Sequence, residues 1–332
     1  MRKPLCLVTG ACGFMGSHMV EVLHEAGYPI RATDLAAAYE QDDPKQGRFP
    51  SVLKRLGVEF LPSDLTDPRT LDPVVKDVKL CFHIAGVFNY SAPFSLLEQV
   101  NYHGTKELLD RLLNQPTFSK LVMWGAGGVY DLDAPGPFRE DETPLAPSNN
   151  YLKSKHMAEQ CVMEYGREKG LRYSVMRPTT VYGPRGVYGG GAMLRVLASG
   201  PAVVGPANFT GRIPFVHVRD VVRAGLFLAE APRTDGEAYN LSDGCELRAI
   251  DLFRFVAKIT GRPFLPLPPV PVDPLKRVLT PMAKGMQWLS ARTGGQSPLE
   301  ADTVAYLGRD ITYANDKLLD AGYELLYPDT RH

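Results

Sequence analysis

Short apolar runs alternate with longer segments of helical periodicity over the first half of the chain. The apolar runs include LCLVTG at 5–10, LCFHIAG at 80–86, KLVMWG at 120–125 and RYSVMRP at 172–178. Because strands joined by helices form βαβ units, this alternation predicts a parallel sheet. The runs are apolar at nearly every position, which is typical of strands buried on both faces. The pattern therefore predicts an α/β fold whose doubly wound parallel sheet is covered by helices on both sides.

The alternation becomes looser after Pro178. Residues 215–231 are typical of a helix and residues 237–244 of a strand, and we expect both to return to the first sheet. A smaller C-terminal domain would then be interleaved with the larger one. The expected larger domain comprises residues 1–177 and about 213–242, and the expected smaller domain comprises about 178–212 and 243–332.

The composition argues against several classes of function. The 332 residues are 44% hydrophobic, as in a soluble globular protein, and the 37 basic residues balance the 37 acidic ones. No overall positive charge attracts nucleic acid, so no nucleic-acid partner is expected. The five cysteines are scattered without a CxxC pair, which favours reduced thiols in a cytoplasmic protein and predicts neither disulfides nor a metal site.

A glycine-rich turn, LVTGACGFMGSH at 7–18, joins the first predicted strand to the first predicted helix. Gly10, Gly13 and Gly16 allow backbone N–H groups and the positive end of the helix dipole to approach a pyrophosphate. The spacing is GxxGxxG rather than the usual GxGxxG, and a tight turn with a closely packed helix would use the same glycines. Placed between a strand and a helix, the turn predicts a Rossmann-like dinucleotide site in the larger domain.

Asp34 ends the next predicted strand, where a carboxylate can accept hydrogen bonds from an adenosine ribose and repel a 2′-phosphate. This position predicts NAD as the cofactor. Arg31 lies on the same strand and could instead attract a phosphate, so NADP stays open as the less favoured cofactor.

Tyr151 and Lys155 occur in the helical segment NYLKSKHMAEQCVMEYG, four residues apart and therefore on one face. A phenol has an ordinary pKa of about 10 and is a poor base at neutral pH, unless nearby positive charge stabilises the phenolate. The pair predicts a general acid/base whose pKa is lowered by the lysine ammonium. The alternative for this common spacing is an exposed tyrosine and a solvated lysine.

Together these motifs resemble the extended short-chain dehydrogenase/reductases along nearly the whole chain. The TGxxGFxG motif of that family is matched at 9–16, its acidic turn after the third strand at Asp64, and its YxxxK motif at Tyr151. HIAG at 83–86 resembles the loop beneath the nicotinamide ribose, and RPTTVYGPRG at 177–186 resembles the segment that closes over the nicotinamide. The resemblance implies that the smaller domain binds the substrate and that the protein is a homodimer.

The resemblance also implies which residues form the site. The expected catalytic residues are Tyr151, Lys155 and Asn101. The expected contacts with NAD are Gly10, Cys12, Gly13, Phe14, Met15, Gly16, Asp34, Asp64, Leu65, Ile84, Ala85, Gly86, Tyr151, Lys155, Pro178 and Thr180. The expected contacts with the substrate are Phe88, Ser91, Ala126, Gly127, Thr179, Tyr182, Met282 and Met286.

The turn WGAGGVYD at 124–131 departs from the family pattern. A serine or threonine normally stands three residues before the Val-Tyr pair, and this chain has Ala126 there. Two interpretations stay open. The protein could bind a dinucleotide without catalysis, or the missing hydrogen bond beside a bulky substrate could come from another donor, namely water, Thr179, Thr180 or Ser91. The intact acid/base pair and cofactor loop favour catalysis.

The same turn and Pro178 indicate the reaction class. Sugar-nucleotide 4,6-dehydratases of similar fold carry Thr-Asp-Glu where this chain has residues 126–128, so dehydration is not expected. Pro178 is closer to the pattern of 3β-hydroxysteroid dehydrogenases, sterol-4α-carboxylate 3-dehydrogenases and reductases of long-chain 3-keto acids. We therefore expect an NAD-dependent oxidoreductase that interconverts a secondary alcohol and a ketone on a hydrophobic substrate. The alternatives are a nucleotide-sugar epimerase or reductase, and a catalytically silent NAD-binding regulator.

The segment 275–292 has the pattern of a basic amphipathic helix. Its apolar residues recur at helical spacing, and no acidic residue interrupts it. Such a helix can cover an apolar substrate pocket, here through Met282 and Met286, or contact a membrane surface peripherally. Packing against its own domain is an equally good interpretation.

Overall fold

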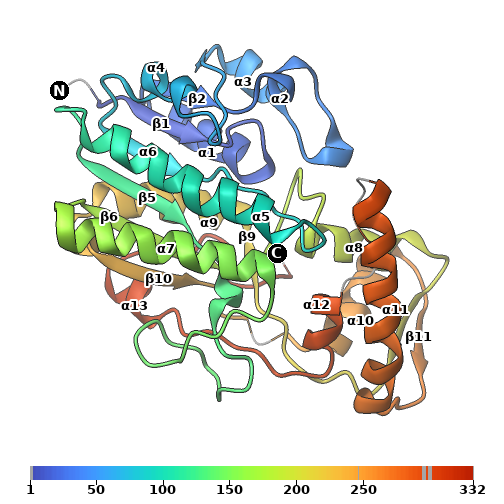
Figure 1. The fold of residues 1–332 in the computed structure, drawn as a ribbon. Helices are drawn as coiled ribbons and strands as arrows, with labels where there is room; N and C mark the ends of the chain where they lie inside the picture. The colour runs from blue at the N-terminus through green and yellow to red at the C-terminus, as the bar shows by residue number, and fades with distance from the viewer. Residues whose placement is uncertain (1–2, 246, 294–296, 298–300, 332) are drawn as a thin grey trace.

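The computed structural model describes residues 3–245, 247–293, 297 and 301–331. A sheet of seven strands, in the order β10-β6-β5-β4-β1-β2-β3, forms the centre of the fold (Figure 1). The strands are β1 (Cys6–Thr9), β2 (Ile30–Thr33), β3 (Glu59–Phe60), β4 (Leu80–His83), β5 (Lys120–Trp124), β6 (Tyr173–Pro178) and β10 (Glu237–Leu241). All neighbouring strands run parallel. The predicted α/β fold with a doubly wound, Rossmann-like sheet is confirmed.

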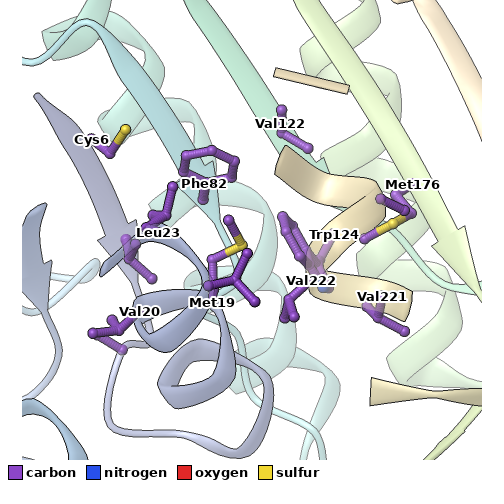
Figure 2. Packing of buried hydrophobic residues seen from close by; sticks show 14 of the residues in the cluster. Cys6, Met19, Val20, Leu23, Phe82, Val122, Trp124, Met176, Val221 and Val222 are labelled. Carbon is purple, nitrogen blue, oxygen red and sulfur yellow. The ribbon is translucent and has the colours of Figure 1, made fainter. Parts of the chain in front are cut away.

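Each face of this sheet is covered by its own helices. Helices α1 (Phe14–Glu25) and α9 (Val218–Glu230) pack on one face, and α6 (Gly104–Leu113) and α7 (Asn150–Lys169) pack on the other (Figure 1). Alternate side chains of one strand belong to opposite cores, because successive strand residues point to opposite faces. In β5, Val122 and Trp124 belong to the core beneath α1 and α9, whereas Leu121 and Met123 face α6 and α7. Figure 2 shows Trp124 beside Val222 of α9, with Met176 of β6 nearby.

Shorter helices complete the larger part of the fold. These are α2 (Ala36–Glu40), α3 (Pro50–Leu56), α4 (Asp72–Val75), α5 (Phe94–Leu97) and a π-helical turn at Glu98–His103 that leads into α6. Single π-helical turns inside α-helices often occur at functional sites. This one places Asn101 in the buried interior.

The remaining elements form a smaller, less regular part of the structure. Strand β7 (Thr180–Tyr182) pairs with β9 (Phe215–His217), and β8 (Val203–Pro206) pairs with β11 (Phe264–Leu267). The helices here are α8 (Gly189–Ser199), α10 (Ala249–Thr260), α11 (Val272–Thr293), α12 (Ala301–Tyr306) and α13 (Asp316–Asp320). The helix predicted at 215–231 begins only at Val218, because the residues before it pair with β7 instead.

The carboxyl ends of the strands lie level with one another at one edge of the sheet. Thr9 of β1 is in register with Thr33 of β2 and with His83 of β4. Strand β1 lies between β2 and β4, so the strand order reverses there. Ligands of open α/β sheets bind in the crevice at such a switch point. The turn after β1 is therefore where the fold alone places a ligand. The predicted strand at 237–244 joins this sheet as β10.

Candidate active site

The turn after β1 is built to hold backbone amides close to a ligand. Gly10 has φ of +65°, and a Cβ there would lie 2.8 Å from the Cα of Ala85. A Cβ on Gly16 would overlap the carbonyl of Gly10, so only glycine lets α1 approach the turn. Gly13 caps α1 without a side-chain hydrogen bond, which leaves the first helical N–H groups available to an anion. The turn fits the pyrophosphate of a dinucleotide.

Asp34 contacts this turn directly. Its carboxylate accepts hydrogen bonds from the N–H of Cys12 at 3.0 Å and of Leu35 at 2.8 Å, and burial raises its pKa. A carboxylate has about four acceptor positions, so two hydrogen bonds leave capacity for ribose hydroxyls. Burial also raises the pKa of the Cys12 thiol, which packs as a core residue.

Arg31 is held away from this site by other partners. Its guanidinium donates to the carboxylate of Glu59 at 2.9 Å and to the carbonyl of Val74 at 3.2 Å. A guanidinium with partners on two sides has few donors left for a phosphate. The structure therefore gives no support to Arg31 as a 2′-phosphate ligand.

A buried hydrogen-bond chain fixes the loop after β4. The hydroxyl of Thr9 accepts from the N–H groups of Ile84 and Ala85 at 3.1 Å and lies 2.9 Å from Nδ1 of His83. On the other side, Nε2 of His83 lies 2.9 Å from the hydroxyl of Thr105, which donates to the carbonyl of Asn101 at 2.6 Å.

This chain determines which nitrogen of His83 carries the proton. Thr105 uses its only hydroxyl proton on Asn101, so it must accept from Nε2–H of His83. Nδ1 is then the acceptor of the Thr9 hydroxyl. Burial lowers the pKa of His83 to about 3, in agreement with a neutral ring. Thr9 and His83 lie within the predicted motifs but were not among the predicted site residues, and neither was Thr105. For Thr9 and His83 the available signal was a polar residue at the end of an otherwise apolar strand.

The side chain of Asn101 forms hydrogen bonds with neighbouring residues of the protein and so affects the site by positioning them. Its side-chain oxygen accepts from the N–H of Val87 at 2.8 Å, and its amide donates to the hydroxyl of Ser154 at 2.9 Å. Ser154 in turn donates to the carbonyl of Tyr151 at 2.8 Å. Asn101 therefore positions α7 against the loop after β4, and its side chain is occupied by these partners. Gly86 packs against it, since a Cβ there would lie 3.0 Å from Oδ1.

Tyr151 and Lys155 share one face of α7, which begins after Asn149, whose side chain accepts from the N–H of Leu152 at 2.8 Å. Burial raises the pKa of Tyr151 and lowers that of Lys155 to about 8, while the charge of Glu159 acts in the opposite direction on Lys155. Within the described ranges, no residue accepts a hydrogen bond from the Lys155 ammonium. A buried ammonium without an acceptor fits the hydroxyls of a nicotinamide ribose.

Aromatic rings surround Tyr151. Its ring meets Phe88 edge to face, with centroids 4.9 Å apart, and Tyr90 with centroids 5.6 Å apart. Phe88 is also stacked on Tyr188, and Tyr188 meets Phe14 at the start of α1 with centroids 6.1 Å apart. Phe88 and Phe14 were predicted site residues, whereas Tyr90 and Tyr188 were not. They come from loops, where periodicity gives no signal.

The turn that carries Ala126 is closely packed. A Cβ on Gly127 would lie 2.8 Å from the carbonyl oxygen of Pro178, and Tyr313 donates to the Gly127 carbonyl at 2.7 Å. Tyr306 of α12 reaches the same turn, since its hydroxyl lies 3.1 Å from the position of a Cβ on Gly128. The sequence prediction did not include either tyrosine.

Two of the donors suggested to replace the missing hydroxyl are buried and unsatisfied. The hydroxyls of Thr179 and Ser91 have no hydrogen-bond partner in the described part of the chain. Thr179 lies against the Ala126 turn, because a Cβ on Gly127 would be 3.3 Å from its Cα. Thr180 belongs to β7, and its methyl group faces Gly190. Thr179 is thus the best placed of the three hydroxyl groups.

The other predicted site residues have mostly structural partners. The carboxylate of Asp64 accepts from the N–H of Thr66 at 2.8 Å, Leu65 is buried against Gly104, and Met15 packs at the edge of the core beneath α1. Tyr182 is buried and, together with residues of the 183–191 segment, lines an open pocket of about 570 Å³.

The two methionines of α11 differ in their surroundings. Met282 is 48% exposed on the outer side of the helix, and Met286 is half-buried. The placement of Met282 does not support its predicted contact with a substrate. The helix packs through Ala283, and the apolar stripe lies at the border of this packing: Leu275, Leu279 and Met286 are half-buried, whereas Val278, Met282 and Leu289 are exposed.

Comparisons with known proteins agree with this geometry. A sterol-4-alpha-carboxylate 3-dehydrogenase, decarboxylating, of Bos taurus is 25% identical over 261 residues, 76% of this chain and 68% of that protein. A 3-beta-hydroxysteroid dehydrogenase of Mycolicibacterium neoaurum is 26% identical over an alignment that covers 97% of this chain and 87% of that protein. The crystal structure of the Thermus thermophilus UDP-glucose 4-epimerase in complex with NAD has the same fold, with a TM-score of 0.71 at 22% identity, covering 97% of this chain and 94% of that chain.

Steroid-type and sugar-type proteins therefore both align with this chain, at identities that do not separate the two branches. The family described as "NAD dependent epimerase/dehydratase family" matches residues 6–242, which span all seven strands of the central sheet. The chain belongs to the NAD dependent epimerase/dehydratase family.

Proposed function

We propose that this protein is an NAD-dependent oxidoreductase that interconverts a secondary alcohol and a ketone on an apolar substrate of the 3β-hydroxysteroid, sterol or long-chain 3-hydroxy acid type. The observation that carries the proposal is the cluster of aromatic rings around the proposed acid/base. The ring of Tyr151 contacts Phe88 and Tyr90, and Phe88 contacts Tyr188. Binding of an apolar ligand to such a site is favoured, because the apolar surface of the ligand is removed from water.

In the proposed mechanism Tyr151 moves the proton. During oxidation its phenolate accepts the proton of the substrate hydroxyl, and during reduction its phenol returns that proton to the carbonyl oxygen. Burial alone raises the pKa of Tyr151, so the reaction needs the ammonium of Lys155 on the same helix face to favour the phenolate. Bound NAD would supply the hydride acceptor. Asn101 and Ser154 hold this part of α7 in place.

Two arginines of the smaller part, Arg185 and Arg309, have partners already, which favours an apolar ligand over a nucleotide sugar. A diphosphate is best bound by arginines with free guanidinium donors. Arg185 is paired with Glu21, and Arg309 donates to Asp133 at 2.7 Å and to the Leu132 carbonyl. These ion pairs and hydrogen bonds support the proposal, and a nucleotide-sugar epimerase or reductase remains the alternative.

A silent NAD-binding regulator is the other alternative, since Ala126 is buried where the family has a hydroxyl. In the proposed enzyme, the hydroxyl of Thr179 takes over that hydrogen bond to the substrate oxygen. Its unsatisfied oxygen and its place against Gly127 support this assignment.

A turnover assay tests the proposal. NADH formation or consumption is followed with hydroxysteroids, 3-hydroxy acids and UDP-sugars, together with the matching ketones. We expect turnover of an apolar alcohol, and Tyr151→Phe should reduce it about 10²- to 10⁴-fold with little change in NAD affinity. Tyr165→Phe is the control, because it removes a hydroxyl from the same helix at a site bonded to Asp110. Turnover of UDP-sugars alone would establish the sugar alternative.

Ala126→Ser separates the enzyme from the silent regulator. Removal of an oxyanion donor elsewhere costs about 10²- to 10³-fold, and we expect a much smaller gain here because Thr179 already donates. If the wild-type protein binds NAD but turns over no substrate and Ala126→Ser alone creates turnover, the alanine silences the protein.

A further inference from the structure

The outer side of α11 carries an apolar stripe that faces solvent. Val278 is 66% exposed, Met282 48% and Leu289 59%. These positions are four and seven residues apart, so the three side chains lie on one face of the helix. Figure 1 shows α11 on the right of the molecule, with α12 and α10 on one side of it and β11 on the other.

The inner side of α11 is what holds the helix on the protein. Ala283 is fully buried, and the ammonium of Lys276 donates to the carbonyl of Ala305 in α12 at 3.1 Å. The side chain of Val272 packs on Gly308, where a Cβ would lie 2.8 Å from it. The side chains of Val278 and Met282 are mostly outside this packing and can meet a partner.

A row of cations flanks the stripe. Arg277, Lys284 and Arg292 are exposed and recur at helical spacing on one side of it. Within the part of the chain that the structure describes, none of the three is paired with an acidic side chain. Arg292 lies over the ring of Trp288, 3.7 Å from its centroid, and Trp288 is itself 58% exposed.

We propose that the outer face of α11 docks on the surface of a membrane containing anionic lipid. Exposed aliphatic side chains, a tryptophan and unpaired cations on one helix are what an interfacial helix uses: apolar groups enter the boundary of the acyl chains, and cations meet the lipid phosphates. A second copy of this chain fits the face less well. A twofold axis across the stripe, which pairs two α11 helices antiparallel, would bring the two rows of cations together. In a parallel pair neither row would meet an acid of the facing helix, because none occurs between Asp273 and Glu300. In the described residues no helix is long and apolar enough to cross the membrane.

Docking would leave the Ala126 turn on the inner side of α11 and α12, facing away from the lipid. Helix α12 packs between α11 and this turn, and the Tyr306 hydroxyl of α12 lies against Gly128. The binding of α11 to a membrane does not depend on the proposed function. If the proposed function is also correct, docking holds the enzyme at the surface of a membrane in which an apolar substrate dissolves.

Flotation of the full chain with lipid vesicles tests the proposal. We expect binding to vesicles of phosphatidylcholine with phosphatidylglycerol, weak or no binding to pure phosphatidylcholine, and release by salt. The double variant Arg277→Glu with Lys284→Glu should lower binding roughly tenfold or more. The double variant Val278→Asp with Met282→Asp should do the same by removing the apolar contact.

Matched controls lie on α10, where Lys258 and Ile259 are exposed. The variants Lys258→Glu and Ile259→Asp make the same chemical changes away from α11 and should bind as the wild type does. Thermal unfolding and NAD titration show that each variant is folded. Failure of the wild type to bind anionic vesicles, or equal loss in the α10 variants, would overturn the proposal. So would a dimer that the α11 variants convert to a monomer without any vesicle binding.

Vesicle binding by a protein that turns over no substrate would leave the membrane proposal standing and remove the enzymatic one. Turnover of a soluble alcohol without vesicle binding would leave the enzymatic proposal standing and overturn the membrane proposal.

Discussion

The ring of Tyr188 is stacked on that of Phe88, with centroids 5.1 Å apart and planes inclined by 29°. Tyr188 belongs to the loop between β7 and α8, whereas Phe88 follows β4. Tyr188 also meets Phe14, the first residue of α1, and Phe88 meets Tyr151. These four rings span the distance from the start of α1, where the glycine-rich turn fits a pyrophosphate, to Tyr151, the proposed acid/base. In the proposed enzyme, the nicotinamide half of the dinucleotide would follow the same path.

We therefore expect Tyr188 to move when NAD binds. Tyr188→Ala should tighten NAD binding about two- to tenfold and speed association, because one aromatic pair contributes about 0.5–1.5 kcal/mol to the closed arrangement. Tyr188→Phe keeps the ring and should behave as the wild type does. Stopped-flow and equilibrium titrations with NAD measure both effects. Weaker binding by Tyr188→Ala would mean that the ring contacts the bound cofactor instead.

Asp34 should control the choice of cofactor. Its carboxylate accepts from the backbone of the turn after β1 and retains acceptors for a ribose. Asp34→Ala should weaken NAD about ten- to a hundredfold, as expected for a lost hydrogen bond to a charged group, and change NADP much less. Arg31→Ala should leave both affinities unchanged, because that guanidinium is bound to Glu59. Isothermal titration calorimetry with NAD and with NADP measures these affinities. A wild-type protein that binds NADP more tightly than NAD would contradict the assignment of NAD as the cofactor.

His83 should make the protein sensitive to acid. Burial lowers its pKa from 6.5 to about 3, so the unfolded chain binds a proton that the folded chain does not. Its contribution to stability is therefore present above pH 6.5 and is lost as the pH falls toward 3, by about 2 kcal/mol between pH 7 and pH 5. Urea unfolding at the two pH values measures the loss. The His83→Gln variant, although less stable at pH 7, should lose about 2 kcal/mol less on acidification; an equal loss would show that other groups dominate.

Trp124 and Gly225 make the packing of α9 on the sheet sensitive to one methyl group. A Cβ on Gly225 would lie 2.5 Å from the ring of Trp124, which is 1% exposed. Gly225→Ala should lower the free energy of unfolding by about 1–3 kcal/mol, the usual cost of overpacking a core. Gly285→Ala is the matched control: a Cβ there meets nothing within 4 Å, so the variant should be more stable by about 0.5–1 kcal/mol. Chemical denaturation measures the free energy of unfolding of both variants. Equal changes in the two variants would contradict the role of the contact between Gly225 and Trp124.

The parallel sheet, the glycine-rich turn and the shared helix face of Tyr151 and Lys155 are predictable from the sequence because their signals are local. Apolar runs buried on both faces mark strands such as β1 and β5, and glycine at position 10 is required by a backbone conformation. Tyr151 and Lys155 share a face by helical geometry alone. None of these inferences needs knowledge of which distant segments meet.

Only the tertiary structure decided which side chains surround those groups. The Thr9–His83–Thr105 chain joins two strands and a helix, and Tyr188 reaches Phe88 from a distant part of the sequence. Periodicity identified the apolar stripe of α11 but not its direction, because a helix can bury any face for which the rest of the fold offers a partner. Here α12 accepts the face around Ala283, and Met282 is left in solvent. Sequence periodicity is a property of one element, whereas burial depends on the element against which it packs.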